Sequence, residues 1–353
     1  DIPLSFLHDG LPERQLSANY REVNNSIPKN PLGNSRTNEL LKLLQSGNIG
    51  SFNWISEQYD HEVQASSVVK PVSGRGRINT NAQVLRPLLS STKGVVLSTG
   101  EYPSYSDINT YHMAACAIDT AIRNAISVGA SLGNLAILDN TCWCSSYDPI
   151  RLGELSDAMR ACYDYAVGYG TPYISGKDSM FNDFKGYDEK GNQVAISIPP
   201  TLLISTIGVI PDISKSLTPE WKVAGDLVYV LGDTNDELGA SEYYKMLAKN
   251  DVTKIGNNVP KVDFKINTKT YQALEKAIGK GVVASSLSIT SGGLAIALAK
   301  ASVGGMLGIN ADLKNLKGSA KTVDAKLFSE SQGRIVVSVV KKNKKVFEAI
   351  KAD

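Results

Sequence analysis

The segment from Ser175 to Asp183, Ser-Gly-Lys-Asp-Ser-Met-Phe-Asn-Asp, has the composition of a phosphate-binding turn. It follows an apolar run, Thr171 to Ile174, that predicts a buried strand. Glycine lets the backbone approach an anion, lysine supplies positive charge, and an adjacent carboxylate or hydroxyl can hold a divalent ion. The spacing is not that of a Walker loop, and a polar turn that merely ends a strand is the structural alternative. The rest of the sequence must decide between these two interpretations.

Length and composition describe an ordinary globular protein. The chain has 353 residues, enough for two or three domains, with 42% hydrophobic and 20% charged residues. Its net charge of +2 gives no electrostatic reason to bind nucleic acid or a membrane surface. No apolar run reaches the length of about 18 residues that a transmembrane helix needs. We therefore expect neither nucleic acid nor membrane as a partner.

Cysteine usage favours a reducing, cytoplasmic compartment, because four cysteines are too few for a disulfide framework. Cys142 and Cys144 flank Trp143 and would share one face of a strand. No second ligand pair accompanies them, so half-buried packing is favoured over a zinc site. The four cysteines are Cys116, Cys142, Cys144 and Cys162.

The ends of the sequence predict a piece of a longer protein. Residue 1 is Asp rather than Met, no signal peptide is present, and residues 345–353 resemble a helix cut short. Residues 1–50 predict an extended linker followed by a short helix over Thr37–Leu44. Residues 51–218 and 219–353 then form two predicted domains, the second truncated at its C-terminus.

Hydrophobic periodicity places helices and strands in alternation, which is typical of an α/β (α+β) fold. Tyr111–Val128 is the most regular helix, with Asp119 and Arg123 on a face apart from the apolar one. The other helices are expected over 149–169, 268–278 and 294–301, and the strands over 135–138, 172–175, 201–210, 227–231, 306–309 and 333–340.

Eight motifs, taken together and in order, resemble phosphoribosylformylglycinamidine synthase, an ATP-dependent amidotransferase of purine biosynthesis. They are Ile55-Ser-Glu-Gln-Tyr-Asp-His-Glu-Val-Gln64, Asn109-Thr-Tyr-His-Met-Ala114, Ala121-Ile-Arg-Asn-Ala-Ile-Ser-Val-Gly-Ala130, Leu138-Asp-Asn-Thr-Cys-Trp143, Gly176-Lys-Asp-Ser-Met180, Gly232-(x)6-Gly239-Ala-Ser-Glu-Tyr243, Ser291-Gly-Gly-Leu294 and Phe328-Ser-Glu-Ser-Gln-Gly-Arg334. The opening Asp1-Ile-Pro-Leu-Ser-Phe-Leu7 resembles the connector between the family's two internal repeats. The match covers nearly the whole chain and corresponds to the second repeat.

The resemblance implies a fold like that of aminoimidazole ribonucleotide synthetase (PurM-like). Its N-terminal domain carries a barrel-forming sheet, and a C-terminal α/β domain packs behind it. In the complete enzyme, ATP and Mg²⁺ serve to activate the amide oxygen of formylglycinamide ribonucleotide, and ammonia from glutamine then displaces phosphate. The implied partners are the first repeat and a glutaminase domain or subunit. The family's catalytic histidines and glutaminase cysteine are not in this chain, so we expect it to be inactive alone.

The resemblance also implies which residues this repeat lends to a shared active site. Asp139, Gly176 and Lys177 match nucleotide-contacting positions, and Ser179 matches a substrate-contacting one. Several relatives have a magnesium-binding Asn where Lys177 stands. Lysine cannot ligate a cation, so we expect it to contact phosphate, with the neighbouring Asp178 a candidate metal ligand. A capping role beyond a strand is the structural alternative for Asp139.

A second, degenerate site is implied inside this repeat, where large members of the family hold a structural Mg–ADP. Its four metal-ligand positions carry over to Asn81, Thr120, Asn124 and Ser288, of which only Asn124 is kept. Three anionic ligands are thus neutral here, and Thr290 replaces a nucleotide-contacting serine. Neutral oxygens offset the charge of a divalent cation poorly. We therefore expect no tight Mg–nucleotide binding at this pseudo-site.

Several alternatives stay open in the sequence. Glu330, Ser331 and Gln332 match a substrate-binding tripeptide of the other repeat, and a structural role is favoured here. The Gly292–Gly293 pair could cradle an anion or serve close helix packing. The whole chain could be a catalytically inert repeat that completes the barrel and holds partners. Other members of the superfamily are disfavoured, because their glycine- and aspartate-rich N-terminal motifs are missing. Without its first half, the exposed sheet should pair into a homodimer.

Overall fold

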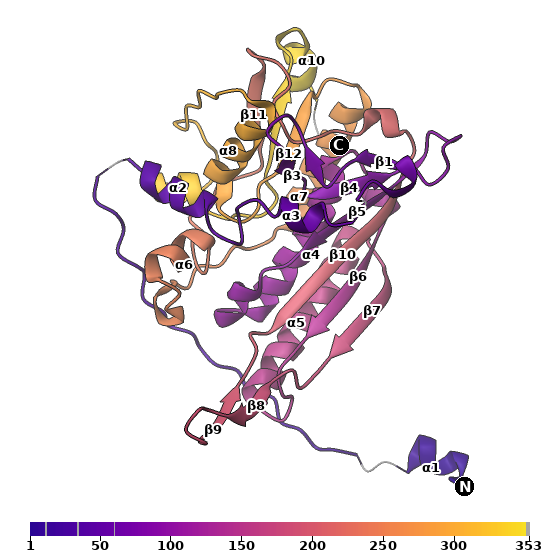
Figure 1. Ribbon diagram of the computed structural model, residues 1–353, viewed down its shortest axis with the longest axis vertical. Helices are drawn as coiled ribbons and strands as arrows, with labels where there is room; N and C mark the ends of the chain where they lie inside the picture. The colour runs from indigo at the N-terminus through magenta and orange to yellow at the C-terminus, as the bar shows by residue number, and fades with distance from the viewer. Residues whose placement is uncertain (11–12, 34, 60, 351–353) are drawn as a thin grey trace.

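The computed structural model describes residues 1–10, 13–33, 35–59 and 61–350, and two sheets organise it (Figure 1). The larger sheet has six strands, and every neighbouring pair is antiparallel except β6 and β7, which run parallel. In spatial order the strands are β1 (Ser67–Val69), β4 (Ala82–Leu85), β5 (Gly94–Gly100), β10 (Thr201–Ile210), β6 (Leu135–Cys142) and β7 (Tyr173–Ser179). This mixed architecture confirms the expected α/β (α+β) class.

Two long helices, α4 (Thr110–Ser127) and α5 (Pro149–Tyr169), cover one face of the six-stranded sheet (Figure 1). The Asn109 side chain caps α4, and Gly170, with φ +68°, ends α5 in the left-handed conformation that glycine favours. Because α5 connects β6 to β7 as a crossover, the carboxyl ends of these two parallel strands lie at the same edge of the sheet. We call this sheet with its two helices the first sheet unit.

The opposite face of the six-stranded sheet carries apolar side chains that no element covers. Val95 pairs with Val209 and Leu97 with Ile207 in the β5–β10 register. Leu97 and Val209 are 40% and 48% exposed, whereas Val96, on the helix-covered face, is fully buried. Both faces of these central strands are thus apolar, as in a sheet built to be covered on both sides. We call the uncovered side the open face.

A second sheet unit follows in sequence and packs at one end of the first (Figure 1). Its three strands are antiparallel, in the order β11 (Leu227–Leu231), β13 (Ile335–Val339) and β12 (Ser285–Ser288). Its helices are α6 (Glu242–Ala248), α7 (Phe264–Gly279), α8 (Gly293–Gly305), α9 (Val323–Phe328) and α10 (Lys344–Glu348). The boundary expected near residue 218 stays a prediction.

The N-terminal residues cross both units before entering the large sheet. After α1 (Leu4–Asp9), an extended segment leads to α2 (Thr37–Leu44), which packs against α6 and α8 of the second sheet unit (Figure 1). The remaining elements are α3 (Asn53–Ser56) and two small hairpins, β2 (Val72–Ser73) with β3 (Ile78–Asn79) and β8 (Phe184–Tyr187) with β9 (Gln193–Ile196).

Most expected helices and strands are confirmed, with three differences. The expected strand at 306–309 is wrong: α8 runs to Gly305 and the next residues form no strand. The N-terminal linker contains α1, although it is otherwise extended as expected. Helix α7 begins at Phe264, earlier than the hydrophobic period indicated, because the Asp263 side chain caps its first turn.

Asp119 and Arg123 lie one turn apart on the same face of α4, as the sequence indicated, and this face is directed to the interior. Both side chains are fully buried. Helix α4 contacts β5, β10, α5, α7 and β12, so it has no solvent face along most of its length. A helix enclosed on all sides must pair its charged residues internally.

Helix α2 gives a direct test of how firmly the N-terminal segment is anchored. Leu43 is 1% exposed within a cluster that includes Tyr243 and Phe328. We predict that Leu43→Ala lowers the free energy of unfolding by roughly 3 kcal/mol, because it leaves a cavity. Denaturant unfolding measures this loss. Leu41, 51% exposed on the same helix, is the control: Leu41→Ala should change stability by less than about 1 kcal/mol. Equal losses would show that α2 is not anchored through Leu43.

Candidate functional site

The carboxyl ends of the parallel strands β6 and β7 bring several of the expected site residues together. Asp139 lies beside Gly176 in the strand register, and Thr141 lies beside Asp178. The Thr141 hydroxyl donates a 2.9 Å hydrogen bond to Oδ2 of Asp139. The carboxylate is therefore held at a defined place on the strand, while its other oxygen, Oδ1, points across β7.

Gly176 provides the space that the Asp139 carboxylate occupies. A Cβ atom built on Gly176 would lie 2.2 Å from Oδ1 of Asp139, closer than any real non-bonded contact. Glycine at 176 therefore allows the carboxylate to lie over strand β7. The sequence pointed to both residues, but only their adjacency across the two strands shows that one makes room for the other.

Lys177 lies within a strand, so the expected lysine-bearing bend is wrong. The strand continues to Ser179, because Gly176 to Ser179 keep pairing with β6. It is an exposed edge strand, contrary to the buried strand expected over 171–174: Ile174 is 59% exposed. The backbone groups of β7 that face β6 are paired, whereas those on its outer edge are not paired with another described strand.

The extended backbone separates the expected site residues between two faces of the sheet. Alternation along β7 places Asp178 on the helix-covered side with Asp139, and Lys177 on the open-face side beside Asn140. Lys177 is exposed and takes part in no ion pair found within the described ranges. Its ammonium group is thus available to a ligand or partner on the open face.

Ser179 ends β7 and its polar groups bond within the chain. Its hydroxyl lies 3.0 Å from Oδ1 of Asn182, and its carbonyl oxygen accepts from the Trp143 backbone N–H and the Asn182 side chain, both at 2.8 Å. These contacts tie the ends of β6 and β7 together. The serine therefore lies on the open-face side of β7 with Lys177, opposite the Asp139 carboxylate, and its hydroxyl already has a partner.

Two of the five expected pseudo-site residues, Thr120 and Ser288, lie around the guanidinium of Arg123, which the family resemblance did not assign to this site. Thr120 and Ser288 both accept hydrogen bonds from the Arg123 guanidinium, and Asn81 donates to the Ser288 carbonyl at 3.3 Å. Asn124 turns away and donates to the Thr99 carbonyl at 2.9 Å. Thr290 is not brought into this cluster by any hydrogen bond of its side chain with another described residue.

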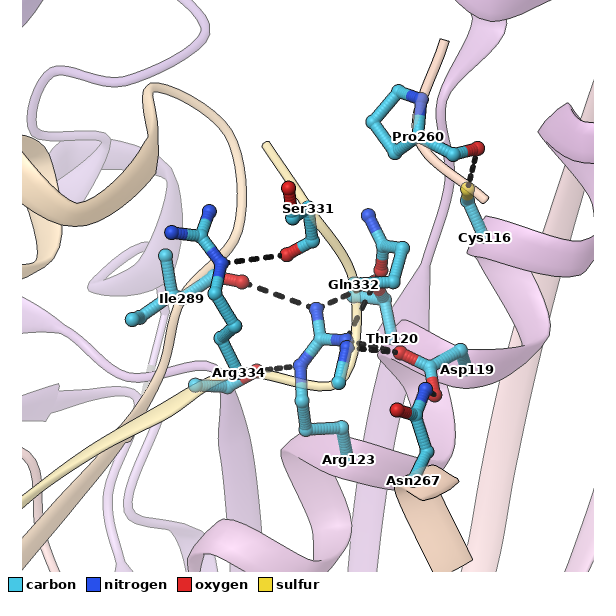
Figure 2. Close-up of polar contacts among 12 residues, drawn as sticks. Cys116, Asp119, Thr120, Arg123, Pro260, Asn267, Ile289, Ser331, Gln332 and Arg334 are labelled. Carbon is cyan, nitrogen blue, oxygen red and sulfur yellow. Dashed lines mark hydrogen bonds and ion pairs between the residues drawn. The ribbon is translucent and has the colours of Figure 1, made fainter. Parts of the chain in front are cut away.

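Arg123 is buried with every N–H group bonded (Figure 2). Nε donates to Ser288 Oγ at 2.7 Å, and Nη2 donates to Thr120 Oγ1 at 3.0 Å and to the Ile289 carbonyl at 3.1 Å. Nη1 donates to Gln332 Oε1 at 3.0 Å and also to the Asp119 carboxylate. All five donors of the guanidinium are used, which is the condition for burying such a cation.

Asp119 supplies the matching negative charge, and it too is saturated. Its Oδ1 accepts from Tyr169 and Tyr271 hydroxyls at 2.5 Å and from Asn267 at 2.9 Å. Its Oδ2 accepts from Arg123 and from the Gly333 backbone N–H at 3.1 Å. Burial lowers the pKa of Arg123, but the Asp119 carboxylate together with the Tyr271 and Tyr102 side chains outweighs this effect and raises that pKa above its usual value.

The Glu330–Ser331–Gln332 segment faces inward, as a structural role requires. Glu330 is 1% exposed, and its carboxylate accepts from the backbone N–H groups of Gly292 at 2.7 Å and Glu242 at 3.0 Å. The Tyr105 hydroxyl donates to its other oxygen at 2.5 Å. The anion near the Gly292–Gly293 pair is therefore this internal carboxylate.

The same two glycines also serve close packing. A Cβ at Gly292 would lie 2.4 Å from the Ile296 side chain, and one at Gly293 would lie 2.5 Å from the Ser329 carbonyl oxygen. Both have positive φ angles. The Gly292–Gly293 pair thus serves both roles that the sequence left open, contact with a carboxylate and close helix packing.

No metal shell is assembled by these residues alone. Within residues 1–10, 13–33, 35–59 and 61–350, no three His, Cys, Asp or Glu side chains gather closely enough to hold a metal ion. In the same residues, no helix is long and apolar enough to cross a membrane.

With this geometry in view, the fold and the sequence comparisons define a class. Residues 223–353 match the family described as AIR synthase related protein, C-terminal domain. The fold resembles Thermotoga maritima PurL complexed with FGAR (TM-score 0.62, 18% identity, covering 89% of this chain and 46% of that one). It also resembles a chain of a HypE–HypF complex (TM-score 0.54, 15% identity, 77% of this chain and 81% of that one). The chain thus has the fold of the proteins related to aminoimidazole ribonucleotide synthetase.

The sequence relatives narrow this class to one family. The chain is 32% identical over 349 residues to the PurL subunit of phosphoribosylformylglycinamidine synthase from Methanocaldococcus jannaschii, covering 98% of this chain and 45% of the relative. It is 31% identical over 352 residues to the subunit from Thermococcus sibiricus, with 99% and 45% covered. The chain is therefore homologous over nearly its whole length to PurL subunits of phosphoribosylformylglycinamidine synthase, and it spans about 45% of their length.

Glu330 gives the site a measurable pH dependence. Burial, with a smaller contribution from Glu242, outweighs its three hydrogen-bond donors and raises the pKa of Glu330 from 4.5 to about 7. The folded protein therefore holds this proton more tightly than the unfolded chain. We predict that the free energy of unfolding falls as pH rises from about 4.5 to 7, by up to about 1.4 kcal/mol per pH unit, and that this contribution is constant above pH 7.

Urea unfolding of wild-type and variant protein between pH 5 and pH 8 tests this slope. Glu330→Gln keeps the acceptor for both backbone N–H groups but cannot ionise, so its stability should vary less over this range. Glu189→Gln, at an exposed turn position, is the matched control and should follow the wild type. An unchanged slope in Glu330→Gln would contradict the assignment.

Proposed function

We propose that this chain is the second repeat of a phosphoribosylformylglycinamidine synthase. The complete enzyme would convert formylglycinamide ribonucleotide to the amidine, with ATP and Mg²⁺ as cofactors. Support comes from 31–32% identity to PurL subunits over nearly the whole chain. It also comes from the shared fold with T. maritima PurL, whose structures were determined with FGAR and with ATP.

The observation that carries the proposal is the Asp139 carboxylate, held by Thr141 over Gly176. A fixed carboxylate within a parallel strand pair, three residues before the end of β6, is suited to holding a nucleotide through its divalent ion. Asp178 lies on the same side of the sheet and is the second candidate ligand. ATP would supply the phosphoryl group that activates the amide oxygen. This chain's part is to position charge, the main demand of such a transfer.

Lys177 and Ser179 would complete the site from the open-face side. An exposed lysine is suited to binding a phosphate. Ser179, two residues further along β7 and on the same face, would contact the substrate. These residues flank an edge strand, so a ligand touching both sides must be enclosed by another part of the enzyme. The proposal therefore requires the first repeat, which would supply the reacting groups.

The alternative is a catalytically inert repeat that completes the barrel and holds partners. Two observations favour it: the Ser179 hydroxyl already bonds Asn182, and the interior cluster is filled by protein groups. One observation argues against it: the absence of a side chain at Gly176 leaves room for the Asp139 carboxylate, whose Oδ1 lies over β7. Substitution of Asp139 distinguishes the two functions: it should lower turnover if the residue serves the active site and leave turnover unchanged if the repeat is inert.

The implied partners are the first repeat and a glutaminase domain or subunit, in the cytoplasm. A structure titled PurLQS from T. maritima, which shares the fold with a TM-score of 0.56, supports the idea of a multi-component enzyme. We propose that residues 51–218 and 219–353 are the two domains of the repeat. The chain alone would have no synthetase activity, and its open face would pair with a second copy.

Substitutions in the complete enzyme separate catalysis from scaffolding. We predict that Asp139→Asn lowers kcat/KM by at least about 100-fold, because a fixed charge is lost where charge develops. Gly176→Ala should give a similar loss by displacing the same carboxylate, and Lys177→Ala should raise the KM for ATP by about 10-fold. Steady-state kinetics measure all three. Lys185→Ala, on exposed strand β8, is the control. Unchanged turnover in Asp139→Asn and Lys177→Ala would favour the inert repeat.

The open face gives a separate prediction about assembly. We expect the isolated chain to dimerise at micromolar concentration, because burial of apolar sheet surface is favourable. Leu97→Lys should shift light-scattering mass to the monomer, since it places a charge at the centre of that face. Val167→Lys, at a 64% exposed position on α5 across the sheet, should leave the dimer intact. A wild-type monomer at these concentrations would rule out the pairing.

A further inference from the structure

The interior cluster around Arg123 has the chemistry of a cation site. Five oxygens from separate parts of the chain surround the guanidinium (Figure 2). They belong to Asp119, Thr120, Ser288, Ile289 and Gln332. One is a carboxylate oxygen and the others are neutral, so the set carries one negative charge, matching one positive charge. This is a balanced site for a monovalent cation.

The geometry suits a planar donor rather than a metal ion. The oxygens that neutral groups contribute lie 2.7–3.1 Å from the guanidinium nitrogens, the spacing of hydrogen bonds. Magnesium requires about 2.0–2.1 Å and octahedral ligands, and it is usually bound by more than one negative oxygen. Thr120 and Ser288, two positions where the family resemblance puts acidic ligands, are both hydrogen-bonded to Arg123. The residues present therefore do not fit a magnesium–nucleotide.

Asn124, the one expected ligand that is kept, does not join the cluster. Its amide nitrogen donates to Thr99, and its Oδ1 is buried without a partner among the described residues. This oxygen would be the natural remnant of a ligand shell. Asn124 follows Arg123 in the sequence but is not among the acceptors of its guanidinium. The cluster is therefore organised around the arginine and not around the former metal ligand.

We infer that the Arg123 side chain is the resident cation of this interior site, held permanently by the protein where the family resemblance places a structural metal–nucleotide. The site joins α4 of the first sheet unit to β12 and the Gln332 segment of the second. The two units are then locked together without a ligand, and their union does not depend on nucleotide concentration. This inference concerns the interior cluster and is independent of the function proposed for Asp139.

Removing the cation and supplying it again tests the inference. We expect Arg123→Ala to lower the Tm by roughly 10 °C, because Asp119 loses its counter-charge. Guanidinium chloride at ~10 mM should then restore several degrees relative to NaCl of the same ionic strength, since a ligand that binds only the folded state raises its stability. Differential scanning calorimetry of the whole chain measures both shifts.

Arg334→Ala is the matched control. Arg334 is also fully buried, but its hydrogen-bond acceptors are neutral: the Ser331 carbonyl at 2.9 Å, the Thr234 hydroxyl at 3.0 Å and the Ser329 carbonyl. Glu237 and Glu330 act on Arg334 only through space, so no carboxylate would hydrogen-bond a guanidinium in the vacated position, which should bind it at least about tenfold more weakly. Rescue of both variants to the same extent, or of neither, would overturn the inference.

A second measurement uses the unmodified chain and does not require any variant to fold. Calorimetric titration with ADP and Mg²⁺ should detect no binding at the interior cluster. A crystal grown with both should show Arg123 still bonded to Thr120 and Ser288. Mg–ADP bound beside Asn124, with the guanidinium displaced, would overturn the inference. Nucleotide bound only at Asp139 would support the proposed function and leave this inference intact.

Discussion

The buried pair of Asp119 and Arg123 is the interaction on which the rest of the structure depends. Each ion lies out of water, so each must find a full set of partners or destabilise the fold. Those partners come from α4, α5, α7, β12 and the segment before β13. Both sheet units must therefore be correctly placed before either charge is satisfied. A pair of this kind stabilises little by itself, but it penalises any other arrangement of the two units.

The two ends of the first sheet unit serve different purposes. Near the second unit, the Asp119–Arg123 pair and Glu330 with its three donors are enclosed and hydrogen-bonded. At the ends of β6 and β7, the Asp139 carboxylate, Asp178 and the Lys177 ammonium stay accessible along an edge strand. A repeat with a hydrogen-bonded interior and an exposed edge strand that carries charged side chains is well suited to share a site with a partner. The open face continues this exposed surface from the edge strand β7 across the central strands of the sheet.

The local elements could largely be predicted, and the differences have physical reasons. Hydrophobic periodicity placed α4 and α5, because such a pattern is contained within a few neighbouring turns of the helix. Glycine and polar residues at 175–179 resembled a turn, but pairing with β6 made this segment a strand. Pairing depends on residues about forty positions earlier, so local composition could not show it. Likewise, α4 looked amphipathic around Asp119, although packing encloses it entirely.

The sequence by itself determined the class of fold, the family and the positions that could carry charge to a phosphate, because these are recorded in residue type and order. Only the tertiary structure decided how those positions combine. It placed Asp139 over Gly176, moved Lys177 to the opposite side of the sheet, and brought Thr120 and Ser288 to Arg123. Such juxtapositions arise from strand register and from the docking of two units, and both are set by contacts between residues far apart in the chain.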